Sequence, residues 1–250
     1  MKKTWFVPFV CAALAGCGTV SVSPGASSVS SAVKQGCDAF EACVGSSASP
    51  AGEGSDFKTE YEQYNGKQND SGKTYRTVDI PSDNPMVTVT AEDVVKRIEN
   101  GDTFYVYFGD ALCPWCRSVI ETAVSEAQKA GVSEIDYVDI WDSEGNEVLR
   151  DSYEVKDGKA VQKQVGTEAY QTLLKNFDSF LEEYTVTDDN DQKYDTGEKR
   201  IYAPTYVYIK NGRAEKLVTG ISEKQTDAWG ELSDDILQDE QNTFTDFFNN

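Results

Sequence analysis

The chain has 250 residues, which is enough for one sizeable domain with additions or for two small domains. Hydrophobic residues make up 39% of it and aromatic residues 11%, which suffices for a packed core. The formal net charge of −20 argues against nucleic acids and anionic membrane surfaces as electrostatic partners.

The first 16 residues have the layout of an export signal. Lys2 and Lys3 form a basic start, and the apolar run over residues 5–15 is too short to remain in a bilayer as a spanning helix. The sequence Leu14-Ala15-Gly16-Cys17 resembles the lipobox of bacterial lipoproteins. This resemblance implies cleavage before Cys17, a lipid on its sulfur and anchorage to the outer face of the cell membrane. A plain secretory signal with a free Cys17 is the alternative.

Residues 17–56 are rich in Ser, Gly and Ala, a composition that does not bury a core and predicts a flexible tether. Cys37 and Cys43 interrupt this tether. In an oxidising compartment two nearby cysteines in a flexible segment favour a local disulfide with each other. A second exchangeable redox pair and intermolecular bonding are the alternatives.

Four short elements are predicted next. Apolar spacing indicates a helix over residues 57–64, alternation predicts a strand over 75–80, and residues 87–89 read as a second short strand. The capping pattern from Thr90 to Asp93 starts a helix that ends near residue 100.

The centre of the chain joins a strand to a helix through two cysteines. Residues 104–108 are apolar or aromatic throughout, as in a strand covered on both faces, and Cys113-Pro114-Trp115-Cys116 follows. Apolar residues then recur at helical spacing to about residue 130. The polar positions, among them Arg117, Ser118, Glu121 and Glu126, fall on the other faces of this helix.

Cys113 therefore lies at a helix N-terminus, where free N–H groups and the helix dipole favour a thiolate. Pro114 suits the first helical position, and Cys116 lies close enough to close a disulfide ring with Cys113. The alternatives are a metal site and a purely structural disulfide. A metal site would need two further ligands, and the chain has no histidine.

A further strand is predicted over residues 135–141, and the succession of strands and helices implies parallel pairing. The region 143–199 contains one clear helical pattern, over residues 167–184. The acidic run 188–191 suggests calcium, but the glycine and glutamate of the calcium loop motif are out of register, so a solvated acidic loop is the preferred interpretation.

Residues 201–219 predict an antiparallel hairpin. Pro204 precedes a strand over 205–210, and Asn211-Gly212 is a typical two-residue turn before a return strand near residues 217–218. The predicted final helix takes in Trp229, Leu232, Ile236 and the aromatic residues up to 248.

Together, the Cys113-Pro114-Trp115-Cys116 motif after a core strand and Ala203-Pro204-Thr205 before a hairpin resemble the thioredoxin superfamily over about residues 88–248. The resemblance implies an α/β thioredoxin fold with a central mixed sheet flanked by helices, covering residues 57–250. It also implies that Pro204 is cis and lies beside the Cys113 sulfur, where the Ala203 backbone pairs with a substrate chain. The tether and lipobox resemble thioredoxin-like lipoproteins of Gram-positive bacteria and, more loosely, bacteriocin transport accessory proteins.

Three departures from the superfamily pattern stand out. Tyr107 occupies the position of the buried aspartate that assists proton transfer, and its hydroxyl is a poor base at neutral pH; Asp110 is the nearby alternative. Ala203 is small where many relatives carry a larger residue. The region 143–199 is an insertion between the third strand and the proline strand, and we expect it to select partners.

The sequence thus predicts an extracytoplasmic thiol-disulfide oxidoreductase. Cys113 is the expected nucleophile, Cys116 the resolving thiol, and Pro114, Trp115, Ala203 and Pro204 the substrate-binding residues. Its redox group is the Cys113–Cys116 pair, without a further cofactor or metal. Expected partners are protein thiols or disulfides and a membrane electron-relay protein. The alternative is a non-catalytic accessory lipoprotein that binds a secreted peptide or a transporter.

Overall fold

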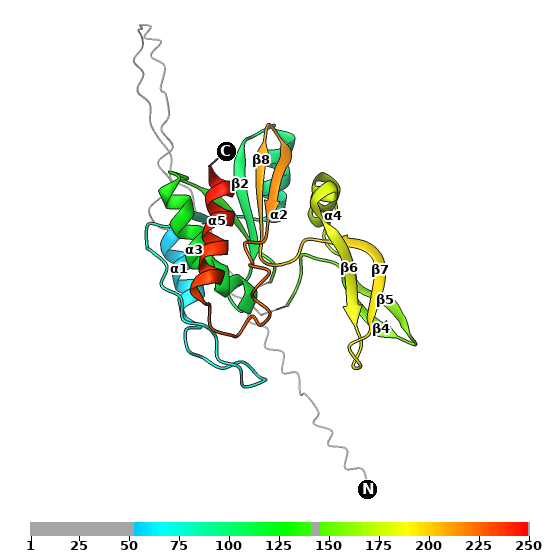
Figure 1. The fold of residues 1–250 in the computed structure, drawn as a ribbon. Coiled ribbons are helices and arrows are strands. Elements are labelled where there is room, and N and C mark those ends of the chain that lie inside the picture. The colour runs from blue at the N-terminus through cyan, green and yellow to red at the C-terminus, as the bar shows by residue number, and fades with distance from the viewer. Residues whose placement is uncertain (1–52, 142–145, 250) are drawn as a thin grey trace, which may run out of the picture. The chain divides into compact units, whose positions relative to one another are not determined.

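A five-stranded sheet organises the part of the chain that the structure, a computed structural model, describes: residues 53–141 and 146–249 (Figure 1). All of these residues belong to one unit, residues 47–250. The strands are β1 (Met86–Thr88), β2 (Phe104–Gly109), β3 (Ile135–Asp139), β8 (Thr205–Lys210) and β9 (Arg213–Val218), in the order β1-β3-β2-β8-β9. β3 pairs parallel with β1 and β2, and β8 pairs antiparallel with β2 and β9, so the sheet is mixed.

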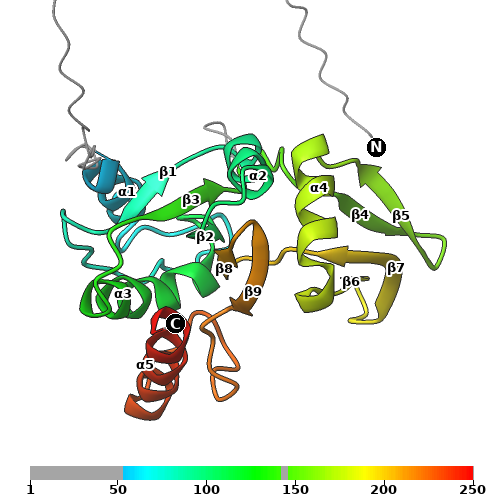
Figure 2. The same cartoon turned by 90° about the horizontal axis from the view of Figure 1, so that it is seen from above.

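Helices cover both faces of this sheet (Figure 2). They are α1 (Glu53–Glu62), α2 (Ala91–Glu99), α3 (Pro114–Lys129), α4 (Glu168–Phe177) and α5 (Asp234–Phe248). One core joins α1, α3 and α5 to the face of β2 that carries Tyr107, and the other joins α2 and α4 to the face that carries Val106 and Phe108. Successive strand residues thus point into different cores, as a pleated strand requires.

Residues 146–200 form a segment of two hairpins with a helix between them, which we call the hairpin segment. β4 (Ser152–Lys156) pairs with β5 (Lys159–Gln164), and β6 (Glu182–Thr187) pairs with β7 (Lys193–Arg200). The predicted helix over 167–184 is wrong beyond Phe177, because a short 3₁₀ turn ends it and the chain then enters β6. The acidic run 188–191 is the turn of the second hairpin, where Asp188 accepts two backbone N–H groups.

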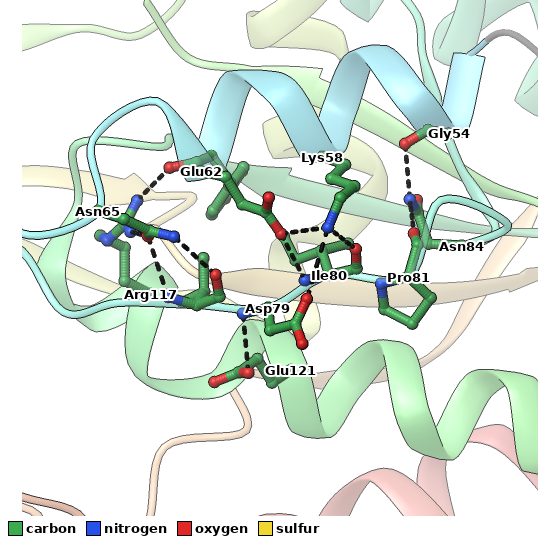
Figure 3. A network of polar contacts seen from close by, with 12 residues as sticks. Gly54, Lys58, Glu62, Asn65, Asp79, Ile80, Pro81, Asn84, Arg117 and Glu121 are labelled. Carbon is green, nitrogen blue, oxygen red and sulfur yellow. Dashed lines mark hydrogen bonds and ion pairs between the residues drawn. The ribbon is translucent and has the colours of Figure 1, made fainter.

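The predicted strand over residues 75–80 is wrong. The Val78 N–H donates to the Asn65 side chain at 3.0 Å, and the Ile80 N–H donates to a Glu62 carboxylate oxygen at 2.9 Å (Figure 3). Because side chains satisfy these donors, the buried residues Val78 and Ile80 need no neighbouring strand.

Two further boundaries differ from the prediction. Residues 53–56, assigned to the tether, are the first turn of α1. The last helix begins at Asp234 with Ser233 as its N-cap, so Trp229 and Leu232 precede it. The Thr90–Asp93 capping box and the turn at residues 211–212 are confirmed. Over the described ranges, none of the helices has the length and apolarity needed to cross a bilayer.

Candidate functional site

The site is built where β2 gives way to α3. The Cys113 N–H donates to the Asp110 carbonyl at 3.2 Å, and α3 begins at the next residue, Pro114. Cys113 is the N-cap of the helix, and its sulfur accepts the Cys116 N–H at 3.4 Å. The predicted position of Cys113 at a helix N-terminus is therefore confirmed, and the free N–H groups of the first turn face its sulfur.

The loop before β8 forms the opposite wall. The Ala203–Pro204 peptide bond is cis. The Cys113 thiol donates to the Ala203 carbonyl oxygen, with 3.6 Å between sulfur and oxygen. Residues from the two separate motifs, 90 positions apart, thus lie in contact.

The two cysteines differ in exposure. Cys113 is partly exposed, whereas Cys116 is fully buried, and neither is in a disulfide. Pro114 and Trp115 are also partly exposed beside Cys113. A partner molecule can therefore reach the first sulfur but not the second.

The pKa values of the two thiols move in opposite directions. A hydrogen bond from the Cys116 thiol lowers the pKa of Cys113, and the N–H groups of Cys116 and Trp115 add to this effect against burial and the charge of Asp110. Burial raises the pKa of Cys116 well above its usual value, the hydrogen bond with Cys113 raises it further, and the Tyr107 hydroxyl acts in the opposite direction. The arrangement therefore makes Cys113 the thiol that ionises first and keeps Cys116 protonated to higher pH.

The two candidates for proton transfer, Tyr107 and Asp110, are both buried. Tyr107 is fully buried and its hydroxyl lies 2.7 Å from that of Tyr61. Asp110 is 7% exposed, and its carboxylate accepts the Leu112 N–H at 2.9 Å. Burial raises the pKa of Asp110, so its carboxyl group is a better base than an exposed aspartate.

A groove of about 420 Å³ opens beside Cys113. On the side of the five-stranded sheet, the groove is lined by residues that follow the ends of β2 and β3, and the hairpin segment and the loop between β7 and β8 contribute the rest. Its lining is Asp110, Leu112, Cys113, Ile140, Trp141, Arg150, Tyr184, Arg200, Tyr202 and Ala203. The hairpin segment therefore supplies part of the surface that a molecule bound at Cys113 would contact.

Glu147 fixes the two arginines of this groove. Arg150 forms a short ion pair with its carboxylate, and Arg200 binds the same carboxylate at 3.0 Å. The Arg200 guanidinium also lies 4.2 Å from the centre of the Tyr184 ring. Since Glu147 pairs with both arginines, the aromatic and aliphatic side chains of the groove are the main groups that a bound molecule would contact.

The sequence does not predict these groove residues, because no motif links them to Cys113. The predicted position of Arg117, Ser118 and Glu126 on polar faces of α3 is wrong, since all three are buried. Arg117 carried a usable signal: it lies three residues before Ile120 and seven before Val124, on the apolar stripe.

Three predicted residues lie outside the described part of the chain: the lipidation site Cys17 and the pair Cys37 and Cys43. Their roles stay predictions. Within residues 53–141 and 146–249, no three His, Cys, Asp or Glu side chains are grouped so as to hold a metal ion.

Comparison with known proteins gives no assignment. No protein-family model matches the chain, and no curated protein has a matching sequence.

Proposed function

We propose that this chain is a thiol-disulfide oxidoreductase of the thioredoxin fold that acts on the dithiols and disulfides of proteins. The observation that carries the proposal is the Cys113 sulfur. It is accessible, caps α3, has a lowered pKa and contacts the Ala203 carbonyl, while a second, buried thiol lies three residues away. A nucleophilic thiolate with a resolving thiol beside it is what disulfide exchange requires.

The sheet supports the choice of fold. The cysteine motif follows β2, the Ala203-Pro204 motif precedes β8, and these two strands are antiparallel neighbours. In this assignment residues 143–199 are an insertion between the third strand, β3, and the proline strand, β8. Arg150 and Tyr184 of that insertion line the groove at Cys113, which supports a role in partner selection.

The exchange proceeds in two balanced steps. The Cys113 thiolate attacks one sulfur of a partner disulfide, and the electron pair of the broken S–S bond leaves on the other partner sulfur, which takes up a proton. Cys116 then loses its proton and attacks the Cys113 sulfur, so that a Cys113–Cys116 disulfide forms and the partner leaves as a second thiol. The partner is reduced and the cysteine pair oxidised; an oxidation runs through the same steps in reverse.

The partner would lie against exposed groups around Cys113. Pro114 and Trp115 flank the sulfur on one side and Ala203 on the other, and the Ala203 backbone would pair with an extended partner chain. A lipid on Cys17 would hold the protein at the outer face of the cell membrane, within reach of a membrane protein that exchanges electrons with the pair.

The test is catalysed disulfide exchange by the full chain. We expect it to accelerate insulin reduction by dithiothreitol, or refolding of a reduced protein, well above the rate of free dithiol. Cys113→Ser is expected to abolish both activities. Cys116→Ser is expected to retain the first step and to accumulate mixed disulfides at Cys113, detectable by mass.

The variants need matched controls. Ser118→Ala, one turn further along α3, changes a buried hydroxyl without touching the sulfurs and should retain activity. Circular dichroism shows whether each variant is folded. If the folded wild type is no faster than free dithiol and Cys116→Ser traps no partner, the oxidoreductase proposal is wrong and a non-catalytic accessory role replaces it.

A further inference from the structure

A row of stacked tyrosines crosses the sheet beneath the cysteines. Tyr137 of β3, Tyr107 of β2 and Tyr206 of β8 are direct cross-strand neighbours. The Tyr107 ring lies 5.4 Å from the Tyr137 ring and 4.4 Å from the Tyr206 ring, with interplanar angles of 23° and 11°. All three side chains are fully buried. The row therefore carries phenol hydroxyls into the core that α3 covers.

A fourth tyrosine joins this row from α1. The Tyr61 hydroxyl lies 2.7 Å from the Tyr107 hydroxyl, and Tyr61 is also fully buried. A Cβ atom at Gly109 would lie 2.1 Å from the Tyr107 hydroxyl, so the glycine at the end of β2 is what admits this hydroxyl. The Tyr107 hydroxyl thus lies at the end of the strand that leads to the cysteines.

Cys116 shares this environment. For Tyr61, Tyr107 and Tyr206 alike, burial raises the pKa of the hydroxyl well above its usual value, and the negative charge of a Cys116 thiolate raises it further. The Tyr107 hydroxyl in turn lowers the pKa of Cys116 through a hydrogen bond, against the larger effect of burial. At neutral pH the phenols stay protonated and act as donors, not as bases.

The three tyrosines have more hydroxyl hydrogens than they use in hydrogen bonds with one another. The hydrogen bond between the Tyr61 and Tyr107 hydroxyls uses the hydrogen of one of them and leaves the hydrogen of the other free to be donated elsewhere. Among the described residues the buried Tyr206 hydroxyl makes no hydrogen bond of normal geometry. The Tyr107 hydroxyl is still near enough to lower the pKa of Tyr206. Buried polar groups without partners are uncommon and mark places where another group can bind. The nearby anion that such donors would suit is the Cys116 sulfur after it has lost its proton.

We propose that Tyr61, Tyr107 and Tyr206 form a buried set of hydroxyl donors that stabilises the Cys116 thiolate in the resolving step. This inference rests on the proposed function. As Cys116 attacks Cys113, the partner sulfur departs with the electron pair of the broken S–S bond and takes up the proton that Cys116 gives up, while the three phenols keep their hydrogens. Tyr107 donates to the reacting sulfur, and Tyr61 is a positioning residue that acts through Tyr107.

The test uses dithionitrobenzoate, which reports the two steps separately. With the reduced full chain in excess, attack by Cys113 releases one coloured thionitrobenzoate, and attack by Cys116 on the resulting mixed disulfide releases the second. The Cys116→Ser chain, which keeps every other thiol, identifies the phase that belongs to Cys116. Rates of both phases are measured from pH 6 to pH 10 by stopped flow.

We expect Tyr107→Phe to slow the second phase about ten- to hundredfold, the range for loss of a hydrogen bond to a charged group, and to move its pH midpoint upward. The first phase should be unchanged. Tyr61→Phe and Tyr206→Phe should act in the same direction with smaller effect. The matched control is Tyr137→Phe, since this hydroxyl belongs to the same row but donates to Glu60 at 2.8 Å.

The outcomes separate this inference from the proposed function. If the wild type gives no phase that Cys116→Ser removes, the proposed function fails. If both phases are present but every folded tyrosine variant matches Tyr137→Phe in rate and pH midpoint, the donor set is wrong and the proposed function stands. Should Tyr107→Phe not fold, Tyr61→Phe and Tyr206→Phe decide the question by the same comparison.

Discussion

Two sulfurs three residues apart have pKa values shifted in opposite directions by contacts that the fold itself supplies. Cys113 gains hydrogen bonds from the start of α3, whereas Cys116 is enclosed on all sides. The hydrogen bond from Cys116, together with the N–H groups of the helix start, distinguishes the nucleophile, and burial together with the same hydrogen bond distinguishes the resolving thiol. The charge of Asp110 acts against this division, since it raises the pKa of Cys113.

Replacing Asp110 should therefore make Cys113 more acidic. Asp110→Asn keeps an oxygen that can accept the Leu112 N–H and removes the negative charge. We expect a lower pKa of Cys113, measured as the pH midpoint of its alkylation by iodoacetamide, followed by mass. The difference in alkylation rate between Asp110→Asn and wild type should vanish at low pH, where the Asp110 carboxyl is itself protonated.

Asp136→Asn is the matched control, because this buried carboxylate pairs with Arg97 and is not among the groups that shift the pKa of Cys113. An unchanged or higher midpoint in Asp110→Asn, with Asp136→Asn equal to wild type, would contradict the role assigned to the Asp110 charge.

At the scale of elements, the sequence predicts what local chemistry determines. The Thr90 capping box, the apolar strand 104–108 and the turn at 211–212 are each set by neighbouring residues, and the structure has them where expected. The extended segment 75–80 was misassigned because its backbone donors bind side chains from α1, the loop after it and α3, which no periodicity reveals.

The same division holds for the candidate site. Cys113 and Cys116 stand out by spacing, and Ala203 and Pro204 by their place before a hairpin. No local sequence pattern marks Arg150 and Tyr184 as groove residues. Tyr184 falls at the end of the predicted helix 167–184, and Arg150 is positioned by its ion pair with Glu147. Their part in the site appears only once the hairpin segment is folded.

Arg117 shows how one side chain joins elements. Its guanidinium donates to the carbonyl oxygens of Arg76, Tyr61 and Ala111 and to the Asn65 side chain, over 2.5–3.0 Å, and is fully buried. These bonds tie the chain between α1 and β1 to the helix that carries the cysteines. The buried cation thus replaces backbone pairing for that segment.

Arg117→Met should lower the free energy of unfolding by about 3 to 5 kcal/mol, because several buried acceptors lose their donors. Urea unfolding measures the loss, and hydrogen exchange should show lower protection around residues 61–78. The control is Lys175→Met on α4, whose side chain is exposed and whose effect should stay within about 0.5 kcal/mol. Equal effects of the two substitutions would show that the Arg117 bonds do not hold the segment.

At the scale of the molecule, several carboxyl groups are buried in a chain whose formal net charge is already −20. Burial raises the pKa of Asp136 to about 6 and those of Asp139 and Glu240 to about 7. Since the unfolded values lie near 4, the folded state binds more protons than the unfolded state between about pH 4 and pH 7. These three groups therefore make the protein less stable as the pH rises through that window.

Glu240 offers the cleanest measurement of this effect. It is fully buried between α5 and α3, where Thr122 donates to one carboxylate oxygen at 3.2 Å. Below about pH 4 the carboxyl group is protonated in both states, so Glu240→Gln and wild type should unfold with equal free energy. At pH 8 the wild type must bury a charge that glutamine lacks, and the shift to about 7 corresponds to about 3 kcal/mol in favour of the variant.

The measurement is the free energy of urea unfolding of both chains from about pH 3 to pH 8, with Glu231→Gln, an exposed substitution with the same change of charge, as control. Carboxylates with lowered pKa values, such as Asp93 through its hydrogen bond with Lys96, change stability in the opposite direction but do so equally in all chains. Only the difference between chains carries the Glu240 contribution. A difference that is constant with pH, or that matches the Glu231→Gln control, would mean that Glu240 is ionised in the folded protein at no cost and that burial between the helices leaves its titration unchanged.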